Sequence, residues 1–366
     1  MFVHALDERA ISHQVALLVG PMLGAGMDVL VVAGHPTRGG MARMPPGVRV
    51  ADLGLGDRPT LLGAPGLAFQ LRRWRPDVLF AHGNGPGRTA ILAQNIARTG
   101  TPIVVVEHTH YSSFYVRRRA VRDLLTRLLY PHADRIAGVS PGVVDDLVRR
   151  FPGISGRTAV LPAAIPDPEP RMRAMEATPD HPWLSRVDGP LVICAIGNVL
   201  PRKGQDTLVR ALPRVRRELG DVRLLIVGRV DDERFSRELE RLASDLGVRD
   251  YVGRTGFQQN PFQFLARADA FAHASRLEGC PTVILEAMSA AIPVVATDCV
   301  TGPDYLLQGG RCGLLVPVGD AEAMAGALIR VLGDRDLAST LRTRGLERAR
   351  EFEAARIASR YLDVLA

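Results

Sequence analysis

Short apolar runs alternate with longer amphipathic stretches, and this alternation occurs twice along the chain of 366 residues. In the first half, the strand-like runs occupy 28–33, 77–81, 102–107 and 135–139, and a helical pattern occupies 88–99. In the second half, the strand-like runs occupy 191–196, 222–227, 268–273, 292–296 and 313–316, and helical patterns occupy 205–218 and 233–246. Strands that alternate with helices favour parallel sheets. The pattern therefore predicts an α/β chain with two doubly wound, parallel-sheet domains.

A proline-rich segment separates the two patterns. Its prolines are Pro162, Pro166, Pro168, Pro170, Pro179, Pro182 and Pro190. Because proline disfavours the interior of helices and strands, we predict a linker over 164–190, between an N-terminal domain over 1–163 and a C-terminal domain over 191–337. The last stretch, 338–366, is predicted to form a helix that packs back on the first domain. Doubly wound sheets bind ligands beyond the carboxyl ends of their strands, so we expect the site in a cleft between the domains.

The composition is that of an ordinary globular protein, with 46% hydrophobic and 23% charged residues. No apolar run approaches the roughly 18 residues of a membrane-spanning helix. The start, MFVHALDERA, becomes acidic too early for a signal peptide, so secretion is not expected and a cytoplasmic location is expected. None of the four cysteines forms a C-x-x-C pair, and we expect them to be reduced and structural.

One lysine stands out among the basic residues. The chain has 46 Lys and Arg residues, and every one except Lys203 is arginine. Lys203 lies in the loop 197–204 between a predicted strand and a predicted helix, where backbone amides and a helix N-terminus suit an anion. An ammonium group meets phosphate as a compact point charge. We interpret Lys203 as a phosphate ligand; the alternative is a solvated lysine in a turn.

A second candidate segment runs from Glu278 to Glu286. Two glutamates stand eight positions apart, and Gly279 and Pro281 precede a predicted helix that runs through 283–291. The positive end of that helix suits a diphosphate, and the carboxylates are available to accept hydrogen bonds from hydroxyl groups. The alternative is one acid that favours the helix dipole and one ordinary helix glutamate.

Five motifs over about 190–320 resemble glycosyltransferase family 4, the retaining group with the GT-B fold. They are LVICAIGNVLPRKGQDTLVRAL, VRLLIVG, GFQQNPFQFLARADAFAHAS, RLEGCPTVILEAMSAAIPVVATD and GPDYLL. The first half is similar only in outline, through HGNGPG, EHTH and HADRIAGVS. The combination of GFQQNP, CPTVILEAM and TDCVTGPDYLL most resembles bacterial surface-polysaccharide enzymes, several of which use UDP-N-acetylhexosamines. The resemblance implies two Rossmann-like domains with an interdomain cleft.

The resemblance also implies roles for individual residues. Lys203 would hold the donor diphosphate, Glu278 would bind hydroxyls of the donor sugar, and His108 would lie at that sugar from the other side of the cleft; these three are the catalytic candidates. Glu286 would bind the ribose. Groups that would surround the sugar and phosphate are Gly279, Cys280, Pro281, Thr282 and Val283, and the loop Gly256–Asn260, with Gly256, Phe257 and Gln258, would border the base. Such enzymes generally need no divalent metal, and no cofactor is expected.

The chain departs from the family's pattern in several places. Asn198 stands where the family usually has arginine, and Arg202 is the candidate replacement; Ala291 stands where glycine is usual. The glycine-rich loop after the first strand is missing, and DERA (7–10) resembles the end of that motif. Almost no room is then left for a strand before it. We infer that either the assigned start is too late or the acceptor-side wall is remodelled.

Histidines that follow predicted strands are further candidates. His82 is our second choice for a residue of the cleft. His108 and His110 form an H-x-H pair that is a weak candidate for metal, because no third ligand is evident. His132 and His273 are interpreted as structural.

The segment 115–135 reads as a basic amphipathic helix, with Val116, Leu124, Leu125, Leu128 and Leu129 among six arginines. It predicts docking to an anionic membrane surface or a lipid-diphosphate acceptor; the alternative is an ordinary helix with a solvated charged face. Nucleic acid is not an expected partner, since aromatics are only 5% and no nucleic-acid motif is present.

These observations together predict a retaining hexosyltransferase, peripheral at the inner membrane face. It would move a hexose or N-acetylhexosamine from a nucleotide diphosphate sugar, with UDP favoured by resemblance, to a lipid-linked or glycan acceptor in surface polysaccharide or glycolipid synthesis. Two alternatives remain open at this point. One is a catalytically impaired nucleotide-sugar-binding protein of the same fold, and the other is a nucleotide-sugar epimerase.

Overall fold

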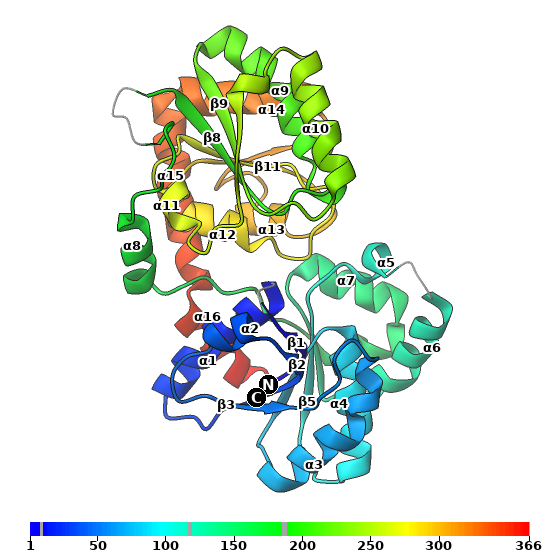
Figure 1. The fold of residues 1–366 in the computed structure, drawn as a ribbon. Helices are drawn as coiled ribbons and strands as arrows, with labels where there is room; N and C mark the ends of the chain where they lie inside the picture. The colour runs from blue at the N-terminus through cyan, green and yellow to red at the C-terminus, as the bar shows by residue number, and fades with distance from the viewer. Residues whose placement is uncertain (8–9, 116–118, 185–188, 366) are drawn as a thin grey trace. The chain divides into compact units, whose positions relative to one another are not determined.

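A computed structural model describes residues 1–7, 10–115, 119–184 and 189–365. The chain divides into two compact units. The first unit contains Met1–Ala164 and the C-terminal segment from Ala354, and the second contains Ile165–Glu353. Each unit is a parallel sheet covered by helices (Figure 1). The predicted α/β fold of two doubly wound, parallel-sheet domains is confirmed.

In the described part of the first unit, seven parallel strands form a sheet in the order β3-β2-β1-β4-β5-β6-β7. The strands are β1 Phe2–Leu6, β2 Leu30–Pro36, β3 Arg49–Asp52, β4 Leu79–His82, β5 Ile103–Glu107, β6 Arg135–Gly138 and β7 Thr158–Val160. The helices are α1 Ala10–Gly24, α2 Arg38–Ala42, α3 Ala64–Trp74, α4 Asn84–Ala97, α5 Tyr111–Phe114, α6 Arg119–Leu129, α7 Pro141–Arg150 and α16 Ala354–Asp363. Short 3₁₀ turns are η1 Thr60–Gly63, η2 Tyr130–His132 and η3 Pro152–Arg157. The order of strands reverses beside β1, as in doubly wound sheets.

In the described part of the second unit, six parallel strands form a sheet in the order β10-β9-β8-β11-β12-β13. The strands are β8 Leu191–Ile196, β9 Val222–Val227, β10 Val252–Gly256, β11 Ala270–His273, β12 Val294–Thr297 and β13 Leu314–Val316. The helices are α8 Pro168–Glu176, α9 Gln205–Leu219, α10 Glu233–Asp245, α11 Phe262–Leu265, α12 Thr282–Ser289, α13 Pro303–Leu307, α14 Ala321–Gly333 and α15 Arg335–Ala349. The 3₁₀ turns are η4 Pro201–Lys203, η5 Arg249–Tyr251 and η6 Arg350–Phe352. Within the described residues of the whole chain, no helix is long and apolar enough to span a bilayer.

The central strands explain why the sequence pattern is readable. Every residue of β4, β5, β11 and β12 is buried, because helices cover both faces of a parallel sheet. The helix α10 follows the usual rule for a surface helix: it buries Phe235, Leu239 and Ala243 and leaves most of its charged side chains exposed.

The strand pattern missed several strands. β1 forms before the motif at 7–10 and lies in the middle of the first sheet, where the sequence left almost no room for a strand. Two members of that motif, Glu8 and Arg9, lie outside the described residues, and so does Val116 of the predicted basic segment 115–135. The edge strands β3, β7 and β10 were not predicted, because their side chains are mostly half-buried or exposed and carry no continuous apolar run.

Two predictions around the domain boundary hold only in part. The proline-rich segment is not wholly irregular: it contains α8, whose prolines Pro168 and Pro170 fall in the first turn, where proline replaces no hydrogen bond of the helix. This segment belongs to the second unit. The C-terminal stretch is two helices: α15 belongs to the second unit, and α16 belongs to the first, where it packs on α1.

Candidate active site

The loop after β8 presents the lone lysine through a tight turn. Lys203 ends the 3₁₀ turn η4, and Gly204 follows with φ +66° as the N-cap of α9. A Cβ at Gly204 would lie 2.0 Å from the carbonyl oxygen of Ala274, so the close approach of this loop to the end of β11 requires glycine. The turn thus brings Lys203 next to the segment that follows β11.

Lys203 and Glu278 form an ion pair, with 2.6 Å between Nζ and Oε1. The Glu278 side chain is only 9% exposed. Burial by itself would raise the pKa of Glu278, but the attraction of Lys203 and the contact with His273 outweigh burial and hold that pKa well below its usual value. Glu278 is therefore ionised at neutral pH and acts as a hydrogen-bond acceptor.

Two further side chains surround Glu278. His273, the last residue of β11, places its Nε2 3.4 Å from Glu278 Oε1, and burial lowers its pKa. Arg202 donates to the carbonyl oxygen of Leu277 over 3.0 Å and lies 3.7 Å from Glu278 Oε2. From the sequence, His273 was interpreted as structural, and the contact of this residue with the candidate site was missed. The position of His273 at the end of a buried strand was the available signal.

The helix after Glu278 is α12, with Pro281 at its N-cap. Gly279 and Pro281 are buried, and Thr282 and Val283, at the start of the helix, are half-buried. Cys280 is also half-buried. The hydroxyl of Thr301 donates to the carbonyl oxygen of Glu278, which ties the loop after β12 to the start of α12.

The same helix carries Glu286, which is buried. Burial raises its pKa to about 7. The helix ends at Ser289 rather than continuing to 291, because Ala291 adopts φ +54°. That left-handed conformation explains why the resemblance expects glycine there.

The loop after β10 carries the predicted neighbours of the base. Gly256 ends the strand with φ +71°, and the ring of Phe257 is 53% exposed. Gln258 Nε2 donates to the carbonyl oxygen of Thr255 over 3.2 Å, and Asn260 Nδ2 donates to that of Ala174 in α8 over 2.7 Å. The loop is thus fixed by its amides while Phe257 remains available for stacking.

Asn198 takes part in a polar contact between neighbouring loops. Its Nδ2 donates to Asp231 Oδ2 over 2.7 Å, and Arg229 Nε donates to the other oxygen of Asp231 over 2.7 Å. The side chain at this position is engaged with the loop after β9. Arg202, its predicted replacement as a cation, lies instead beside Glu278.

The histidine candidates lie in the first unit. His82 Nδ1 and His108 Nε2 are 3.1 Å apart, at the carboxyl ends of β4 and β5. Burial lowers the pKa of His108 to about 4 and that of His82 well below its usual value, so both rings are neutral at pH 7. Next to them, Tyr130 donates to Glu107, and burial raises the pKa of Glu107 to about 7. The sequence did not single out this carboxyl.

The structure therefore brings Lys203, Arg202 and Glu278 together at one end of the second sheet. It places His82 and His108 together at the end of the first sheet. Within the described residues, no cluster of three His, Cys, Asp or Glu side chains is arranged to hold a metal ion.

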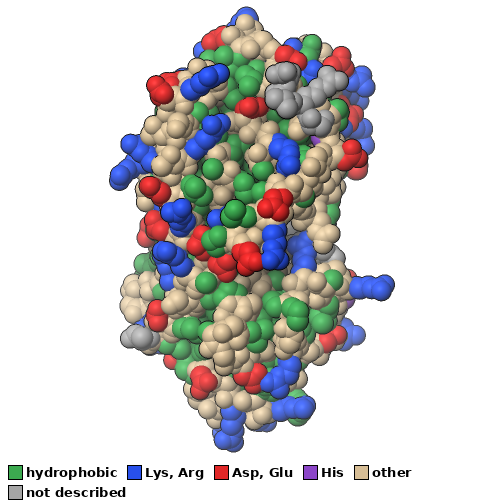
Figure 2. All heavy atoms as spheres, turned by 90° about the vertical axis from the view of Figure 1, so that its left-hand side faces the viewer, with side chains coloured by type: hydrophobic (Ala, Val, Ile, Leu, Met, Phe, Trp, Pro, Cys, Tyr) green, Lys and Arg blue, Asp and Glu red, His purple; other side chains and the backbone are tan. Residues whose placement is uncertain are grey.

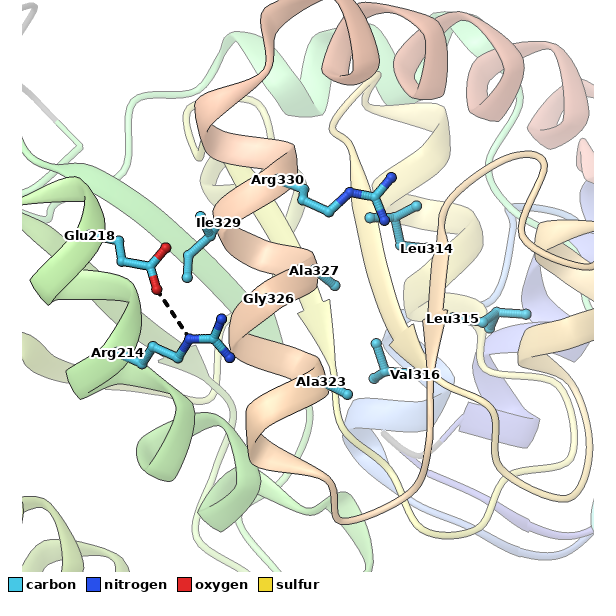
Figure 3. A pocket seen from close by; sticks show the side chains of 10 residues that line it. All are labelled: Arg214, Glu218, Leu314, Leu315, Val316, Ala323, Gly326, Ala327, Ile329 and Arg330. Carbon is cyan, nitrogen blue, oxygen red and sulfur yellow. Dashed lines mark hydrogen bonds and ion pairs between the residues drawn. The ribbon is translucent and has the colours of Figure 1, made fainter.

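A cavity of about 480 Å³ lies elsewhere in the second unit, among α9, β13 and α14 (Figure 3). It is lined by Arg214, Glu218, Leu314, Leu315, Val316, Ala323, Gly326, Ala327, Ile329 and Arg330. None of the candidate residues reaches it, and its lining is mainly apolar side chains with no group suited to diphosphate chemistry other than two arginines. The candidate active site is therefore the Lys203–Glu278 constellation rather than this cavity.

Comparison with known proteins identifies the family of the chain. Residues 190–334 match the family described as "Glycosyl transferases group 1", and residues 9–164 match "Glycosyl transferase 4-like domain". The chain is 36% identical to a GDP-mannose-dependent alpha-(1-6)-phosphatidylinositol monomannoside mannosyltransferase of Mycolicibacterium smegmatis, over 70% of this chain and 68% of that protein.

A further relative and a solved structure extend the comparison. The chain is 29% identical to the N-acetylgalactosamine-N,N'-diacetylbacillosaminyl-diphospho-undecaprenol 4-alpha-N-acetylgalactosaminyltransferase of Campylobacter jejuni, over 77% of this chain and 74% of that enzyme. The fold of this chain resembles that of Anabaena Alr3699/HepE, which was solved in complex with UDP. The TM-score is 0.80, the identity is 20%, and the match covers 100% of this chain and 98% of that chain. The chain belongs to family 4 of the glycosyltransferases and has the GT-B fold.

Proposed function

We propose that this glycosyltransferase transfers a hexose or N-acetylhexosamine from a UDP-linked donor, with retention of configuration, to a lipid-linked or glycan acceptor of surface polysaccharide or glycolipid synthesis. The observation that carries the proposal is the 2.6 Å pair of Lys203 and Glu278 between the loop after β8 and the loop before α12. One group supplies positive charge for a diphosphate, and the other supplies an ionised acceptor for hydroxyl groups.

Departure of the diphosphate is the demanding step, because negative charge grows on the leaving oxygen. Lys203 Nζ and backbone N–H groups at the start of α12 are fixed in place before the reaction and stabilise that charge; the candidates are those of Gly279, Cys280, Thr282 and Val283, since Pro281 has no N–H. The acceptor oxygen attacks the anomeric carbon on the side from which the phosphate leaves. The bond from that carbon to the phosphate oxygen breaks, and the acceptor's proton passes to the departing phosphate oxygen.

The carboxylates have separate roles in this proposal. Glu278 is ionised and buried, so it orients the hydroxyls of the donor sugar, and no covalent nucleophile is assigned. Glu286, with a pKa near 7, both donates and accepts hydrogen bonds and suits the hydroxyls of a ribose. Phe257 and Gln258 are the candidates for contact with the base. His108, neutral at pH 7, is the candidate for contact with the donor sugar from the first unit.

The relatives support the acceptor class more directly than the donor. The names of the Campylobacter and mycobacterial enzymes include a diphospho-undecaprenol and a phosphatidylinositol acceptor. The name of the mycobacterial enzyme gives GDP-mannose as its donor, whereas the name of the Campylobacter enzyme gives no nucleotide. UDP is therefore the part of the proposal that needs the most direct test.

Thermal unfolding in the presence of UDP, GDP and their sugars tests the donor. A ligand at about 100 times its Kd stabilises the folded state by about 2.7 kcal/mol, and UDP is expected to raise the melting temperature more than GDP. A larger shift with GDP overturns the choice of base but leaves the site standing.

Turnover of the preferred donor with a panel of acceptors tests the catalytic assignment. Lys203→Ala and Glu278→Ala are each expected to lower turnover at least about a hundredfold, which corresponds to about 2.7 kcal/mol. Wild-type rates in both variants refute the site.

A second candidate, a nucleotide-sugar-binding protein with impaired catalysis, is favoured by one observation, namely that Asn198 replaces the family's arginine and is engaged with Asp231. Binding of donor without hydrolysis or transfer to any acceptor supports that candidate. If NMR shows that the donor sugar is interconverted when no acceptor is present, that result supports an epimerase instead.

A further inference from the structure

The side chain of Arg276 reaches from the loop after β11 to the segment after β8. Its terminal nitrogens Nη1 and Nη2 donate to the two carboxylate oxygens of Asp206, in the first turn of α9, over 2.9 and 2.7 Å. Nη1 also donates to the carbonyl oxygen of Pro201, at the start of η4, over 2.5 Å. Arg276 and Asp206 are 70 positions apart in the chain, so one side chain joins two separate loops.

The residues that Arg276 contacts lie on both sides of Lys203 in the sequence. Pro201 precedes Lys203 and Asp206 follows it. The backbone N–H of Arg276 donates to the carbonyl oxygen of Arg202, the residue before Lys203, over 2.8 Å. Arg276 therefore holds the turn that carries Lys203 by its backbone and by its guanidinium group.

The loop of Arg276 also carries Glu278, the partner of Lys203. In the opposite direction, Arg202 Nη1 donates to the carbonyl oxygen of Leu277 over 3.0 Å. The strands β8 and β11 are parallel neighbours, so the two loops begin at the same edge of the sheet, but the ladder of the sheet ends before them. These side-chain contacts therefore set the position of one loop against the other, and with it the 2.6 Å separation of the ion pair.

Arg276 differs from an ordinary surface arginine. Figure 2 shows basic and acidic side chains interspersed over the face that it draws, and exposed pairs of such side chains contribute little to stability. The side chains of Arg276 and Asp206 are 38% and 24% exposed, and the planar guanidinium group meets both oxygens of one carboxylate. A lysine would keep the charge but not this fixed fork. Because Asp206 balances the charge and engages both terminal nitrogens, Arg276 acts through the turn.

We propose that Arg276, paired with Asp206, is a positioning residue: it holds the turn of Lys203 against the loop of Glu278, so that the ammonium group meets the departing diphosphate at a fixed place. A cation stabilises a transition state best when it is in position before charge develops. The inference deepens the proposed function and rests on it for the diphosphate. The placement of Lys203 by Arg276 does not depend on the reaction.

The first test is the kinetics of sugar transfer by Arg276→Lys, Asp206→Asn and the double variant. Each single variant is expected to lower kcat about tenfold and to change the KM for the donor less than about twofold. The reason is that Lys203 keeps its charge and still meets a bound diphosphate, but is no longer held where the charge develops. The double variant is expected to lower kcat no further, since the two residues act as one unit.

Other roles of Arg276 give different results. If Arg276 binds the donor phosphate itself, Arg276→Lys raises KM, and Asp206→Asn, which frees the guanidinium group, does not lower kcat. That result overturns the proposal. Wild-type kcat in either single variant also overturns it, as do losses that multiply in the double variant.

Arg214→Lys is the matched control. Arg214 lies on α9, and its side chain is 35% exposed against 38% for Arg276. It donates to Glu218 over 3.1 Å and to Glu322 over 2.9 Å, and it lines the cavity of Figure 3 rather than the turn of Lys203. This variant is expected to keep the wild-type kcat and KM. An equal loss of kcat here overturns the proposal, because the loss would then follow from disturbing any arginine–carboxylate pair of this helix.

Urea unfolding tests the placement of Lys203 without donor or acceptor. Lys203→Met removes the ion pair with Glu278 and is expected to lower the urea midpoint. If Arg276 holds this pair together, that shift is expected to be smaller by at least about a third in an Arg276→Lys background and unchanged in an Arg214→Lys background. Equal shifts in all three backgrounds overturn the proposal.

The outcome is separable from that of the proposed function. A wild-type chain that transfers sugar from no nucleotide donor refutes the proposed function, and the urea midpoints still decide whether Arg276 positions Lys203. Normal transfer together with equal midpoint shifts refutes the positioning role and leaves the proposed function standing.

Discussion

Two buried glutamates, one in each unit, have opposite protonation behaviour. Glu107 ends β5 and is fully buried, and burial raises its pKa to about 7. Glu278 follows β11, and its side chain is 9% exposed, yet its pKa lies well below the usual value. The two side chains are similarly buried, so the difference between their pKa values comes from the groups that surround them.

The hydrogen-bond partners of Glu107 are neutral, with an added electrostatic attraction to Arg88, whereas the partner that Glu278 contacts directly is a cation. Tyr130 donates a neutral hydroxyl to Glu107, whereas Lys203 brings a full positive charge to Glu278. A neutral hydrogen bond only partly offsets the loss of water around a carboxylate, and a nearby ammonium more than offsets it. The comparison teaches that one cation, placed by one tight turn, decides which buried carboxyl is kept ionised.

Removing that cation is expected to have the largest effect. Lys203→Met leaves Glu278 buried without its main counter-charge, so its pKa rises and the free energy of unfolding falls by about 3 kcal/mol. Thermal or urea unfolding at neutral pH measures the change. The double variant Lys203→Met with Glu278→Gln is expected to recover most of the lost stability but none of the activity.

Arg202→Met is the matched control for this prediction. Arg202 is the neighbouring cation, but it lies 3.7 Å from Glu278 and its side chain is 35% exposed. Its loss is expected to cost under about 1 kcal/mol. If Arg202→Met destabilises as much as Lys203→Met, the ion pair is not what distinguishes the two glutamates.

The second prediction concerns Glu107, whose carboxyl is replaced by a neutral amide. Because the pKa of Glu107 is higher in the folded than in the unfolded chain, the folded state binds its proton more tightly. The stability that this proton contributes is complete below pH 4.5 and is lost as the pH rises to about 7. Glu107→Gln is therefore expected to remove this decline and to stabilise the chain at pH 8 by at most about 3 kcal/mol. Unfolding curves at pH 5 and pH 8 measure it.

Glu169→Gln provides the control, since Glu169 is an exposed glutamate on α8. It changes the net charge equally and is expected to leave the pH dependence almost unchanged. If Glu107→Gln loses more stability between pH 5 and pH 8 than the wild type does, the pKa of Glu107 is not raised by folding and the interpretation is wrong. Glu286 also has a raised pKa, so part of the decline is expected to persist.

The smallest effect is expected from Tyr130→Phe. Removing the hydroxyl takes away a hydrogen bond that lowers the pKa of Glu107, so that pKa rises further and the decline in stability moves to higher pH. The loss of stability is expected to be about 1 kcal/mol at pH 7. Repeating the change in a Glu107→Gln background should leave the pH dependence unmoved, and any movement there would show that Tyr130 acts on another group.

Much of the second unit could be predicted from the sequence. β8 and β9 coincide with the predicted runs, because their residues are almost continuously apolar. The scarcity of lysine directed attention to Lys203, and the spacing around Gly279 and Pro281 directed it to Glu278. The contact between them could not be derived from spacing, because it depends on the approach of Gly204 to Ala274, and three connections between strands separate these two residues in the chain.

The first unit was less predictable for a physical reason. β1 is only five residues long and includes His4, so its pattern is weak, yet it lies in the middle of the sheet. α6 was recognised as amphipathic, but its polar partners Tyr111, Asn84 and Arg150 lie on three separate elements. A pattern along one helix shows that two faces differ and does not show which face is inside.

The sequence by itself determined the α/β class, the two-domain organisation, the family and the residue types available for diphosphate chemistry. These depend on local periodicity and on motifs of fixed spacing. Only the tertiary structure decided that Lys203 holds Glu278 ionised, that Glu107 is a protonatable buried carboxyl, and that α6 turns Leu124 and Leu128 outward. Each of these depends on groups from elements far apart in the chain, and the free energy of a buried charge or an exposed leucine is set by what surrounds it.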